Sequence, residues 1–521
     1  MLSGRSLPQV PRILGDSLIV SANRYPQKAV VIVGEREYSY QELLDHAQGL
    51  ASFLVDRGLQ RGDRVAIYLE NSWESVFSIF GVLLAGGVIV VINPQTKADK
   101  LAYILGESEA SFLLTSSVLE AQFAPALSGA SKLRCVVCSG SLSSSLQTSV
   151  ESFDNALQQG ANCQRPISGV IASDLASLIY TSGSTGSPKG VMHTHLSMRF
   201  ALDSLVEYLR LSDSDRILNV LPLAFDYGLY QLLMTVHIGA TLILEKSFAF
   251  PVAIFKRIEQ CSVTVFPGVP TIFSMILSMY ERKQFSFSSV LRVTNTAAAL
   301  PANYVPTLKA IFPSALIYKM YGLTECKRVS YLEPELIDQY PHSVGRAIPG
   351  TEVFLTKANG ESVAPGEQGI LHVRGPHLML GYWKHKDLTN KMLLDDVYQN
   401  QKVLCSQDWF SMDEDGLLYF VGRSDDMIKS KGEKVSPIEV ENVIYGIEGV
   451  KEVGVIGVED GVLGQSIRAF VALEEGSELN GRKIKKTCND KLEPYMVPKE
   501  VIVLDELPKS ANGKIDKKAL S

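Results

Sequence analysis

The chain has 521 residues, a hydrophobic fraction of 46%, a charged fraction of 20% and a formal net charge of −6. Apolar and aromatic residues are spread over the whole length, which excludes a disordered chain, a coiled coil and a collagen-like repeat. The acidic balance argues against a nucleic-acid binder, which would concentrate basic charge on one face. At roughly 150 residues per domain, the length predicts about three or four structural units, which can be fused into one large body.

Short β-branched runs alternate with amphipathic stretches from the N-terminal part onward. The runs at 29–34 and 63–70 are predicted strands, and the stretch 39–58 between them repeats leucine and alanine at helical spacing after Ser39. Strands that alternate with helices indicate an α/β fold class with mainly parallel sheets flanked by helices.

The segment Val76 to Ile92 carries no charge and is marginally short for a bilayer span. Gly86 and Gly87 divide it into a helix-like half and a β-branched half, so we predict a buried helix followed by a buried strand. The start of the chain lacks the apolar stretch of a signal peptide. We expect a cytoplasmic protein without a membrane anchor.

Cys135 and Cys138 form the only C-x-x-C among seven cysteines. A zinc site needs a second pair of ligands at suitable spacing, and the sequence has none, so we predict a buried strand with reduced thiols. The serine-rich segment 139–152 that follows is predicted to be a surface loop or a short insertion.

The segment 181–190, TSGSTGSPKG, follows the apolar run LASLIY. Glycines and small hydroxylated residues after a strand let backbone N–H groups approach phosphate oxygens, and Lys189 adds a cation. Pro188 precedes the lysine where a Walker A motif needs glycine, which disfavours a conventional P-loop NTPase. The segment predicts a phosphate-binding loop of another kind.

Charges and glycines interrupt the apolar pattern near Gly422, and a fresh pattern begins after them. We predict a large, multi-subdomain N-terminal domain over 1–421, a hinge at 422–426 and a small mobile α+β domain over 427–521. The small domain should contain a helix at 437–445, the strands GVIGV and AFVAL, a lysine-rich helix and a last strand, VIVL.

Five motifs in a fixed order resemble the adenylate-forming superfamily of acyl-CoA synthetases, amino-acid adenylation domains and beetle luciferases. They are TSGSTGSPKG (181–190), YGLTE (321–325), CSQDWF (405–410), GRSDDMIK (422–429) and NGKID (512–516). The resemblance covers nearly the whole chain. It implies that ATP and Mg²⁺ activate a carboxylic acid as an acyl adenylate with release of pyrophosphate, and that the acyl group then passes to a thiol.

The resemblance also implies a role for individual residues. The β- and γ-phosphates would be held by the loop, whose residues are Thr181, Ser182, Gly183, Ser184, Thr185, Gly186 and Lys189. Thr324 would contact the α-phosphate, and Glu325 would hold Mg²⁺, as a carboxylate can. The nucleoside would be bound by Tyr321 and Gly322, by the small Ala297 and Ala298 beside the adenine, and by Asp408 and Arg423 at the ribose.

Two further roles fall near the C-terminus. Lys514 of the NGKID motif would reach the substrate carboxylate and the α-phosphate as the catalytic lysine, together with Thr324 and Glu325. Asp425 matches the hinge position, about which the small domain would swing between adenylation and thiol transfer.

The segment 225–233, FDYGLYQLL, bears on the choice of acid. In amino-acid adenylation domains an aspartate directly after this phenylalanine pairs with the α-ammonium of the substrate, and here it is Asp226. An aspartate in a pocket pairs well with an ammonium and is costly beside an uncharged chain. A structural aspartate hydrogen-bonded to the backbone is the alternative.

The rest of the acid pocket is predicted to be bulky and apolar, lined by Tyr227, Tyr230, Pro267, Met320 and Val329. The pattern resembles the stand-alone L-prolyl carrier-protein ligases of toxin biosynthesis. It predicts activation of L-proline and transfer to the phosphopantetheine thiol of a separate acyl or peptidyl carrier protein, as in nonribosomal peptide synthesis. An acyl- or aryl-CoA ligase with a structural Asp226 is the main alternative, and an ATP-binding module without ligase activity is a third.

His193 and His195 lie beside the phosphate loop and invite a metal or general-base interpretation. Neither has further ligands nearby in the sequence, and adenylation needs no base because the carboxylate is already ionised. We therefore predict packing and hydrogen-bonding roles for both.

Overall fold

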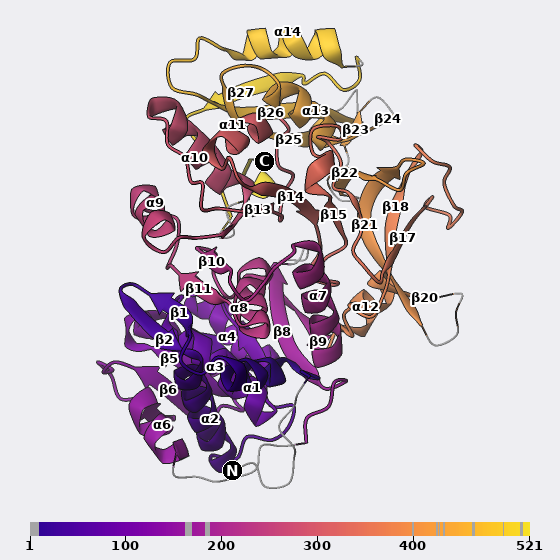
Figure 1. Cartoon of the computed structure of the whole chain (residues 1–521). Helices are drawn as coiled ribbons and strands as arrows, with labels where there is room; N and C mark the ends of the chain where they lie inside the picture. The colour runs from indigo at the N-terminus through magenta and orange to yellow at the C-terminus, as the bar shows by residue number, and fades with distance from the viewer. Residues whose placement is uncertain are drawn as a thin grey trace. The chain divides into compact units, whose positions relative to one another are not determined.

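The computed structural model describes residues 10–161, 169–182, 188–396, 398, 401–423, 426, 428–430, 433–460, 464–492, 494–510 and 514–520 (Figure 1). The chain divides into two compact units. Unit 1 consists of Met1–Pro267, Gly322–Arg328 and Arg374–Leu404, and unit 2 consists of Gly268–Tyr321, Val329–Val373 and Cys405–Ser521.

Unit 1 contains a mixed sheet with the strand order β19-β9-β8-β4-β3-β5-β6-β7. The strands are β3 Arg64–Tyr68, β4 Val88–Val91, β5 Ala110–Ser116, β6 Cys135–Ser139, β7 Ser149–Ser152, β8 Leu175–Ser182, β9 Pro188–Thr194 and β19 Gly381–Tyr382. Pairing is parallel from β8 through β7 and antiparallel at β9 and β19. The predicted α/β class with mainly parallel sheets is confirmed.

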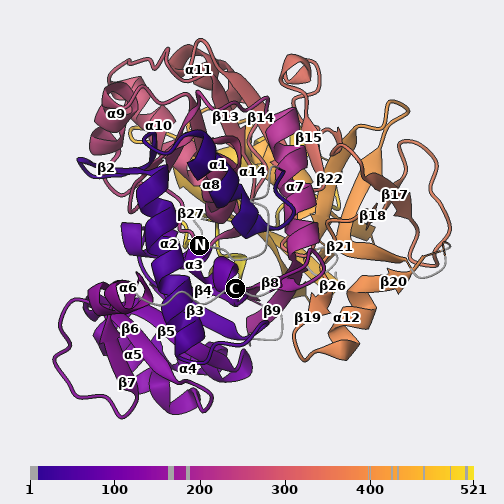
Figure 2. The ribbon, with the colours of Figure 1, turned by 60° about the horizontal axis from the view of Figure 1, so that its bottom comes forward.

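A second set of strands in unit 1 has the order β12-β10-β11-β1-β2. These strands are β1 Ala29–Val33, β2 Arg36–Ser39, β10 Arg216–Asn219, β11 Thr241–Leu244 and β12 Val265–Gly268. The helices of unit 1 are α1 Leu14–Arg24, α2 Tyr40–Asp56, α3 Trp73–Ala85, α4 Ala98–Glu107, α5 Glu120–Ala126, α6 Phe153–Ala161, α7 His195–Tyr208, α8 Asp226–Ile238, α9 Pro251–Gln260 and α12 Lys386–Met392. Helix α8 packs against α1 and α7 (Figure 2).

Local signals explain where the first helices begin and end. Ser39 caps α2, since its hydroxyl accepts the Glu42 N–H while the Glu42 carboxylate accepts the Ser39 N–H at 2.7 Å. The uncharged segment 76–92 forms most of α3 followed by β4, as predicted, and α3 ends at Gly86, whose φ of 79° is left-handed. Within the described ranges, no helix is both long and apolar enough to cross a membrane.

The segment around the C-x-x-C motif is part strand, part loop. Cys135 and Cys138 are buried in β6, as predicted. The prediction of a loop over 139–152 is wrong at both ends: Ser139 completes β6, and Ser149–Ser152 form β7, which pairs in parallel with β6 at the edge of the sheet. Backbone hydrogen bonds to β6 outweigh the weak strand propensity of the serines.

In unit 2, two helices alternate with two strands up to residue 321, and mainly antiparallel strands follow them. Its elements up to residue 423 are α10 Pro270–Arg282, β13 Arg292–Asn295, α11 Tyr304–Ile311, β14 Leu316–Tyr321, β15 Ser330–Leu332, β16 Arg346–Ala347, β17 Glu352–Thr356, β18 Gln368–Arg374, β21 Lys402–Met412 and β22 Leu418–Arg423. The strand β20 Leu393–Asp395 belongs to unit 1. The pairing β21–β22 sets Asp408 opposite Arg423.

The C-terminal part of unit 2 has its own sheet, with the order β24-β23-β26-β25 and β27 paired to β26. Its elements are β23 Ile428–Ser430, β24 Glu433–Val435, α13 Pro437–Tyr445, β25 Val450–Asp460, β26 Gly464–Leu473, α14 Gly481–Lys491 and β27 Glu500–Leu504. Both helices contribute to one apolar core with the sheet, and the helix and strands predicted for this part of the sequence are confirmed.

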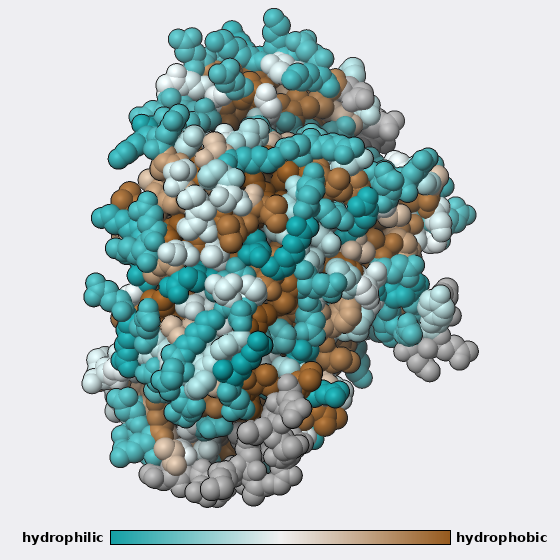
Figure 3. All heavy atoms as spheres, viewed as in Figure 1, coloured by the Kyte–Doolittle hydropathy of each residue, from teal (hydrophilic) through white to brown (hydrophobic). Residues whose placement is uncertain are grey.

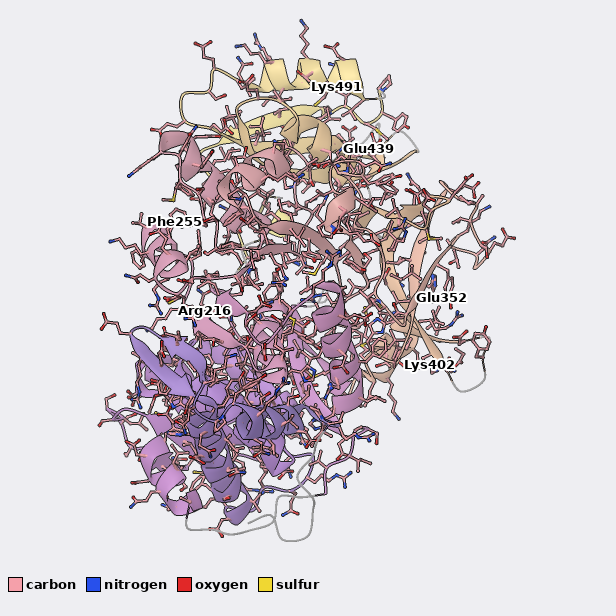
Figure 4. All side chains as sticks on the ribbon, in the orientation of Figure 1. Arg216, Phe255, Glu352, Lys402, Glu439 and Lys491 are labelled. Carbon is pink, nitrogen blue, oxygen red and sulfur yellow. The ribbon has the colours of Figure 1, made fainter. Side chains whose placement is uncertain are left out.

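Helix α14 shows how the lysine-rich pattern folds. Its buried side chains are Ile484 and Cys488, four residues apart on one face, and its remaining residues are polar and outward (Figure 3). Lys491 on α14 and Glu439 on α13 are labelled in Figure 4. The predicted boundary at 422–426 stays a prediction, and Asp425 lies outside the described residues.

Candidate active site

The predicted phosphate loop connects two antiparallel strands. Thr181 at the end of β8 pairs with Lys189 near the start of β9. The ammonium of Lys189 lies 5.6 Å from the ring centroid of Tyr382, which is a cation–π distance. Gly183, Ser184, Thr185 and Gly186, and the side chain of Ser182, lie outside the described residues.

Tyr382 links Lys189 to the YGLTE motif. Its hydroxyl donates to Glu325 Oε1 at 2.7 Å, and the backbone of Glu325 accepts the Met379 N–H at 2.8 Å. Tyr382 was not predicted, because it lies in none of the five motifs. Mg²⁺ is commonly held by one or two carboxylates together with substrate phosphates, and a single positioned carboxylate beside a phosphate loop fits that pattern. That Glu325 holds Mg²⁺ stays a prediction.

His193 holds the backbone of the same motif. Its Nε2 donates to the backbone oxygen of Thr324 at 2.7 Å, and burial lowers the pKa of His193 well below its usual value. His195 accepts the Leu14 N–H at 3.3 Å, and burial lowers its pKa to about 4. The predicted hydrogen-bonding and packing roles of both histidines are confirmed.

Gly322 is required by a close approach of the backbone. A Cβ on Gly322 would lie 2.4 Å from the backbone oxygen of Lys327, closer than real contacts allow. Lys327 itself has a left-handed φ of 66°, which is uncommon for a residue with a side chain. The motif glycine therefore lets the chain double back, so that residues 327 and 328 lie against residue 322.

In unit 2, three of the predicted nucleoside residues form one hydrogen-bonded group, which we call the nucleoside cluster: Tyr321, Asp408 and Arg423. The Tyr321 hydroxyl donates to the carboxylate of Asp408, and Arg423 Nε lies 3.3 Å from the other oxygen of that carboxylate. Asp408 is buried, and the ring of Tyr321 packs on Phe410 and Phe420 at centroid distances of 4.8 and 5.9 Å. Both phenylalanines come from β21 and β22 and were not predicted.

Two other predicted residues of unit 2 belong to this region of the sequence. Ala297 has a left-handed φ of 77° in the loop after β13, a strained conformation of the kind that clusters at functional sites. Ala298 follows it and is exposed.

Lys514 is the predicted catalytic lysine, and it also belongs to unit 2. It keeps contact with solvent, yet desolvation by the surrounding protein and the like charge of Arg423 lower its pKa to about 8, while the carboxylate of Asp408 opposes the change. Lys514 is thus close enough to the nucleoside cluster to interact with it electrostatically.

Asp226 begins α8 in unit 1, where a carboxylate is favoured by the helix dipole. It is buried, and its Oδ1 accepts a hydrogen bond from Lys327 Nζ at 2.9 Å. Arg328 lies on the other side, with Nη1 3.8 Å from Asp226 Oδ2. Neither basic residue was predicted, although two adjacent cations between the apolar Cys326 and Val329 are a signal of a buried ion pair.

Tyr227 and Tyr230 complete this group, which we call the Asp226 cluster: Asp226, Tyr227, Tyr230, Lys327 and Arg328. The guanidinium carbon of Arg328 lies 5.3 Å from the ring centroid of Tyr227 and 5.9 Å from that of Tyr230. The Tyr230 hydroxyl donates to the backbone oxygen of Met198 at 3.1 Å. The two tyrosines therefore contact a cation, which the prediction of a bulky, apolar lining did not include, and that they line an acid pocket stays a prediction.

The remaining predicted pocket residues are buried. Pro267 lies in unit 1, whereas Met320 and Val329 lie in unit 2. That all three line one acid pocket stays a prediction.

Comparisons with known proteins agree over the full chain. Residues 18–383 match the AMP-binding enzyme family, and residues 439–514 match the AMP-binding enzyme C-terminal domain. The long-chain-fatty-acid–CoA ligase of Bacillus subtilis is 30% identical over 549 residues, which cover 99% of this chain and 95% of that protein.

Two solved structures are similar throughout. The anthranilate CoA ligase AuaEII in complex with anthranoyl-AMP superposes with a TM-score of 0.89 at 27% identity, covering 99% of this chain and 97% of that one. The o-succinylbenzoate coenzyme A synthetase of Bacillus subtilis, in complex with ATP and a magnesium ion, gives 0.81 at 25% identity, covering 96% and 98%.

These findings overturn the predicted substrate and thiol acceptor. The relatives are CoA ligases of fatty and aryl acids, so the prediction of an L-proline ligase that serves a separate carrier protein is wrong. The physical reason lies in the Asp226 cluster. The carboxylate that would have paired with an α-ammonium is already paired with Lys327 and faces a second cation, Arg328.

Proposed function

This chain belongs to the AMP-binding enzyme family, and from that premise we propose that it is an AMP-forming ligase that joins a carboxylic acid to coenzyme A. As an adenylate-forming acid–thiol ligase it uses ATP and Mg²⁺. The proposal concerns the thiol, which would be that of coenzyme A, and the acid, which would lack an α-ammonium group.

The chain's own residues would divide the reaction between them. Lys189 and the loop before it would bind the outer phosphates, and Glu325, held by Tyr382, would supply the carboxylate for Mg²⁺. Charge builds up on the α-phosphate when the substrate carboxylate attacks it, and a positioned ammonium stabilises that charge. Lys514, with a pKa of about 8, would supply it in its charged form at neutral pH.

The observation that carries the proposal is the ion pair between Asp226 and Lys327, at 2.9 Å in a buried setting. A substrate ammonium would have to displace Lys327 from the carboxylate while standing near Arg328. Removing one partner of a buried pair leaves an uncompensated charge, which costs about 3–5 kcal/mol. An uncharged or acidic substrate meets no such cost, which favours the CoA ligases over the amino-acid ligases.

The test is product formation by the full-length protein with ATP and Mg²⁺. Fatty, aryl and dicarboxylic acids and the twenty amino acids would each be offered with coenzyme A and, separately, with a holo carrier protein. We expect acyl-CoA and AMP from acids without an α-ammonium. Thioester formed only on the carrier protein, or turnover of amino acids alone, would contradict the proposal.

A further inference from the structure

The Asp226 cluster contains an arginine whose hydrogen-bonding capacity is only partly used. Arg328 is 4% exposed, and its Nη1 donates to the backbone oxygen of Lys327 at 2.7 Å. Its Nε and Nη2 are buried, and neither has a hydrogen-bond acceptor among the described residues. A buried donor without an acceptor destabilises the fold, and more so when the group is charged.

Nearby groups relieve this cost only in part. The nearest carboxylate oxygen, Asp226 Oδ2, is 3.8 Å from Nη1, which is beyond hydrogen-bond distance, and the other oxygen is bonded to Lys327. The rings of Tyr227 and Tyr230 add cation–π attraction, which is stronger at a desolvated site than at an exposed one. Glu325 and Asp226 both attract Lys327. Neither Asp226 nor the aromatic rings accept the Nε–H and Nη2–H bonds of Arg328.

The two unpartnered nitrogens have a specific geometry. In a planar guanidinium, the Nε–H and one N–H of Nη2 point in parallel from the same edge. That edge matches the two oxygens of a carboxylate, which accept both bonds at once. A single hydroxyl or carbonyl oxygen would satisfy only one of them.

We infer that the acid activated by this enzyme carries a second carboxylate, which binds in bidentate fashion to the Nε–Nη2 edge of Arg328. The substrate class is therefore a dicarboxylic acid, and the inference rests on the proposed CoA ligase function. The second carboxylate would accept the two hydrogen bonds that no described residue accepts, and it would turn Arg328 into a specificity-determining residue.

Neither the reacting carboxylate nor the nucleotide fits this edge as well. A bidentate guanidinium occupies both oxygens of a carboxylate and draws charge from them, whereas the reacting carboxylate must attack phosphorus through one of them. The predicted phosphate and metal residues, Lys189 and Glu325, contact Tyr382, whereas Arg328 contacts the tyrosines of α8.

The experiment compares matched acids on the full-length enzyme. Adipate would be paired with hexanoate, succinate with butyrate, and terephthalate with benzoate, and each would be measured twice. Initial rates of acyl-CoA formation give kcat/KM, and calorimetric titration without ATP gives the dissociation constant of the acid. We expect at least one dicarboxylate to exceed its monocarboxylate partner by roughly 10²-fold in kcat/KM, since a site built to bond a polar group rejects analogues that lack it.

Variants connect the preference to the arginine. Arg328→Met should abolish the preference for the dicarboxylate and improve turnover of the monocarboxylate. Arg328→Lys keeps the charge but loses the parallel donors, so it should lower kcat/KM for the dicarboxylate at least tenfold, and it serves as the second variant if the methionine variant does not fold. Arg257→Met is the matched control, because Arg257 pairs with Glu245 at 2.8 Å elsewhere in unit 1, and it should leave the preference unchanged.

The outcomes separate the two proposals. The inference would be overturned if, for the wild-type enzyme, every monocarboxylate matched its dicarboxylate partner in kcat/KM and in dissociation constant. The proposed CoA ligase function would still stand. A preference retained in both Arg328 variants would overturn the inference too, as would a loss of ATP affinity as large as the loss of dicarboxylate affinity. Failure of every acid to give acyl-CoA would refute the ligase proposal, and the acid titrations would still decide the role of Arg328.

Discussion

The nucleoside cluster of unit 2 and the Asp226 cluster of unit 1 each contain a buried aspartate, but the family motifs identify the partners of only the first. Asp408 is bonded by Tyr321 and Arg423, which family motifs identify together with it. Asp226 is bonded by Lys327 and approached by Arg328, which no motif identifies. Where the partners of a charged residue belong to the same motifs, its role can be transferred from relatives. Where they do not, the local charge balance decides.

The largest effect is expected from the removal of Asp226. Asp226→Ala leaves Lys327 and Arg328 buried without the carboxylate closest to them, so we expect the free energy of unfolding to fall by about 3–5 kcal/mol. Chemical denaturation measures it. The control is Asp203→Ala, which removes a half-exposed carboxylate that pairs with Arg199 and His237 and should cost no more than about 1 kcal/mol.

A double variant sharpens the result. Asp226→Ala combined with Lys327→Met removes both charges of the closest pair and should recover part of the lost stability. If Asp226→Ala costs as little as Asp203→Ala, the aspartate does not serve to neutralise its basic neighbours.

At Lys514, which interacts with the nucleoside cluster, we expect a substitution to change catalysis without unfolding the protein. Lys514→Ala should slow adenylation roughly 10²-fold or more, because it removes a cation that stabilises the transition state, while ATP still binds. Acid-dependent ATP–pyrophosphate exchange and calorimetric ATP titration measure the two properties. Lys517→Ala, which breaks an ion pair with Glu441 on the same terminal segment, is the control, and it should keep the exchange rate within a few-fold. Unchanged exchange in Lys514→Ala would remove this lysine from the mechanism.

The lowered pKa of Lys514 predicts a pH dependence. The ammonium form is the one that stabilises negative charge, and its fraction falls as pH rises through about 8. Adenylation should therefore decrease about tenfold between neutral pH and pH 9. Lys514→Arg stays charged over this range, so any activity it retains should be flat. An equal decline in both proteins would assign the pH effect to another group.

The smallest effect is expected at the tyrosine of the nucleoside cluster. Tyr321→Phe removes one donor from the buried Asp408, so KM for ATP should rise about fivefold to tenfold with kcat little changed. Tyr419→Phe on β22 is the matched control, because its hydroxyl bonds Asp413 at 3.0 Å outside the cluster. Equal KM values in the two variants would show that the Tyr321–Asp408 bond does not support nucleotide binding.

Much of the fold follows from local patterns. The capping box at Ser39 and the glycine that separates α3 from β4 are short-range signals, and the structure confirms both elements. The strand β7 was missed because serines carry little strand propensity, and its hydrogen bonds come from β6, ten residues earlier in the chain.

The candidate site divides in the same way. The motifs identified Tyr321, Asp408 and Arg423, and the register of β21 with β22 sets Asp408 opposite Arg423. Tyr382 and the hydrogen-bond partner of His193 could not be found, since each depends on a contact with the YGLTE motif across a large separation in the chain.

The superfamily, the α/β class and the nucleotide chemistry could be predicted from the sequence, because these depend on contiguous motifs and on hydrophobic periodicity. The ion pairing of Asp226 could be seen only in the folded chain. Its partner Lys327 is 101 residues away, and the pair forms because Gly322 lets the chain turn back beneath α8. A carboxylate has no fixed function in a pocket until the charges around it are known, and here two buried cations already pair with Asp226 or approach it, without any substrate ammonium.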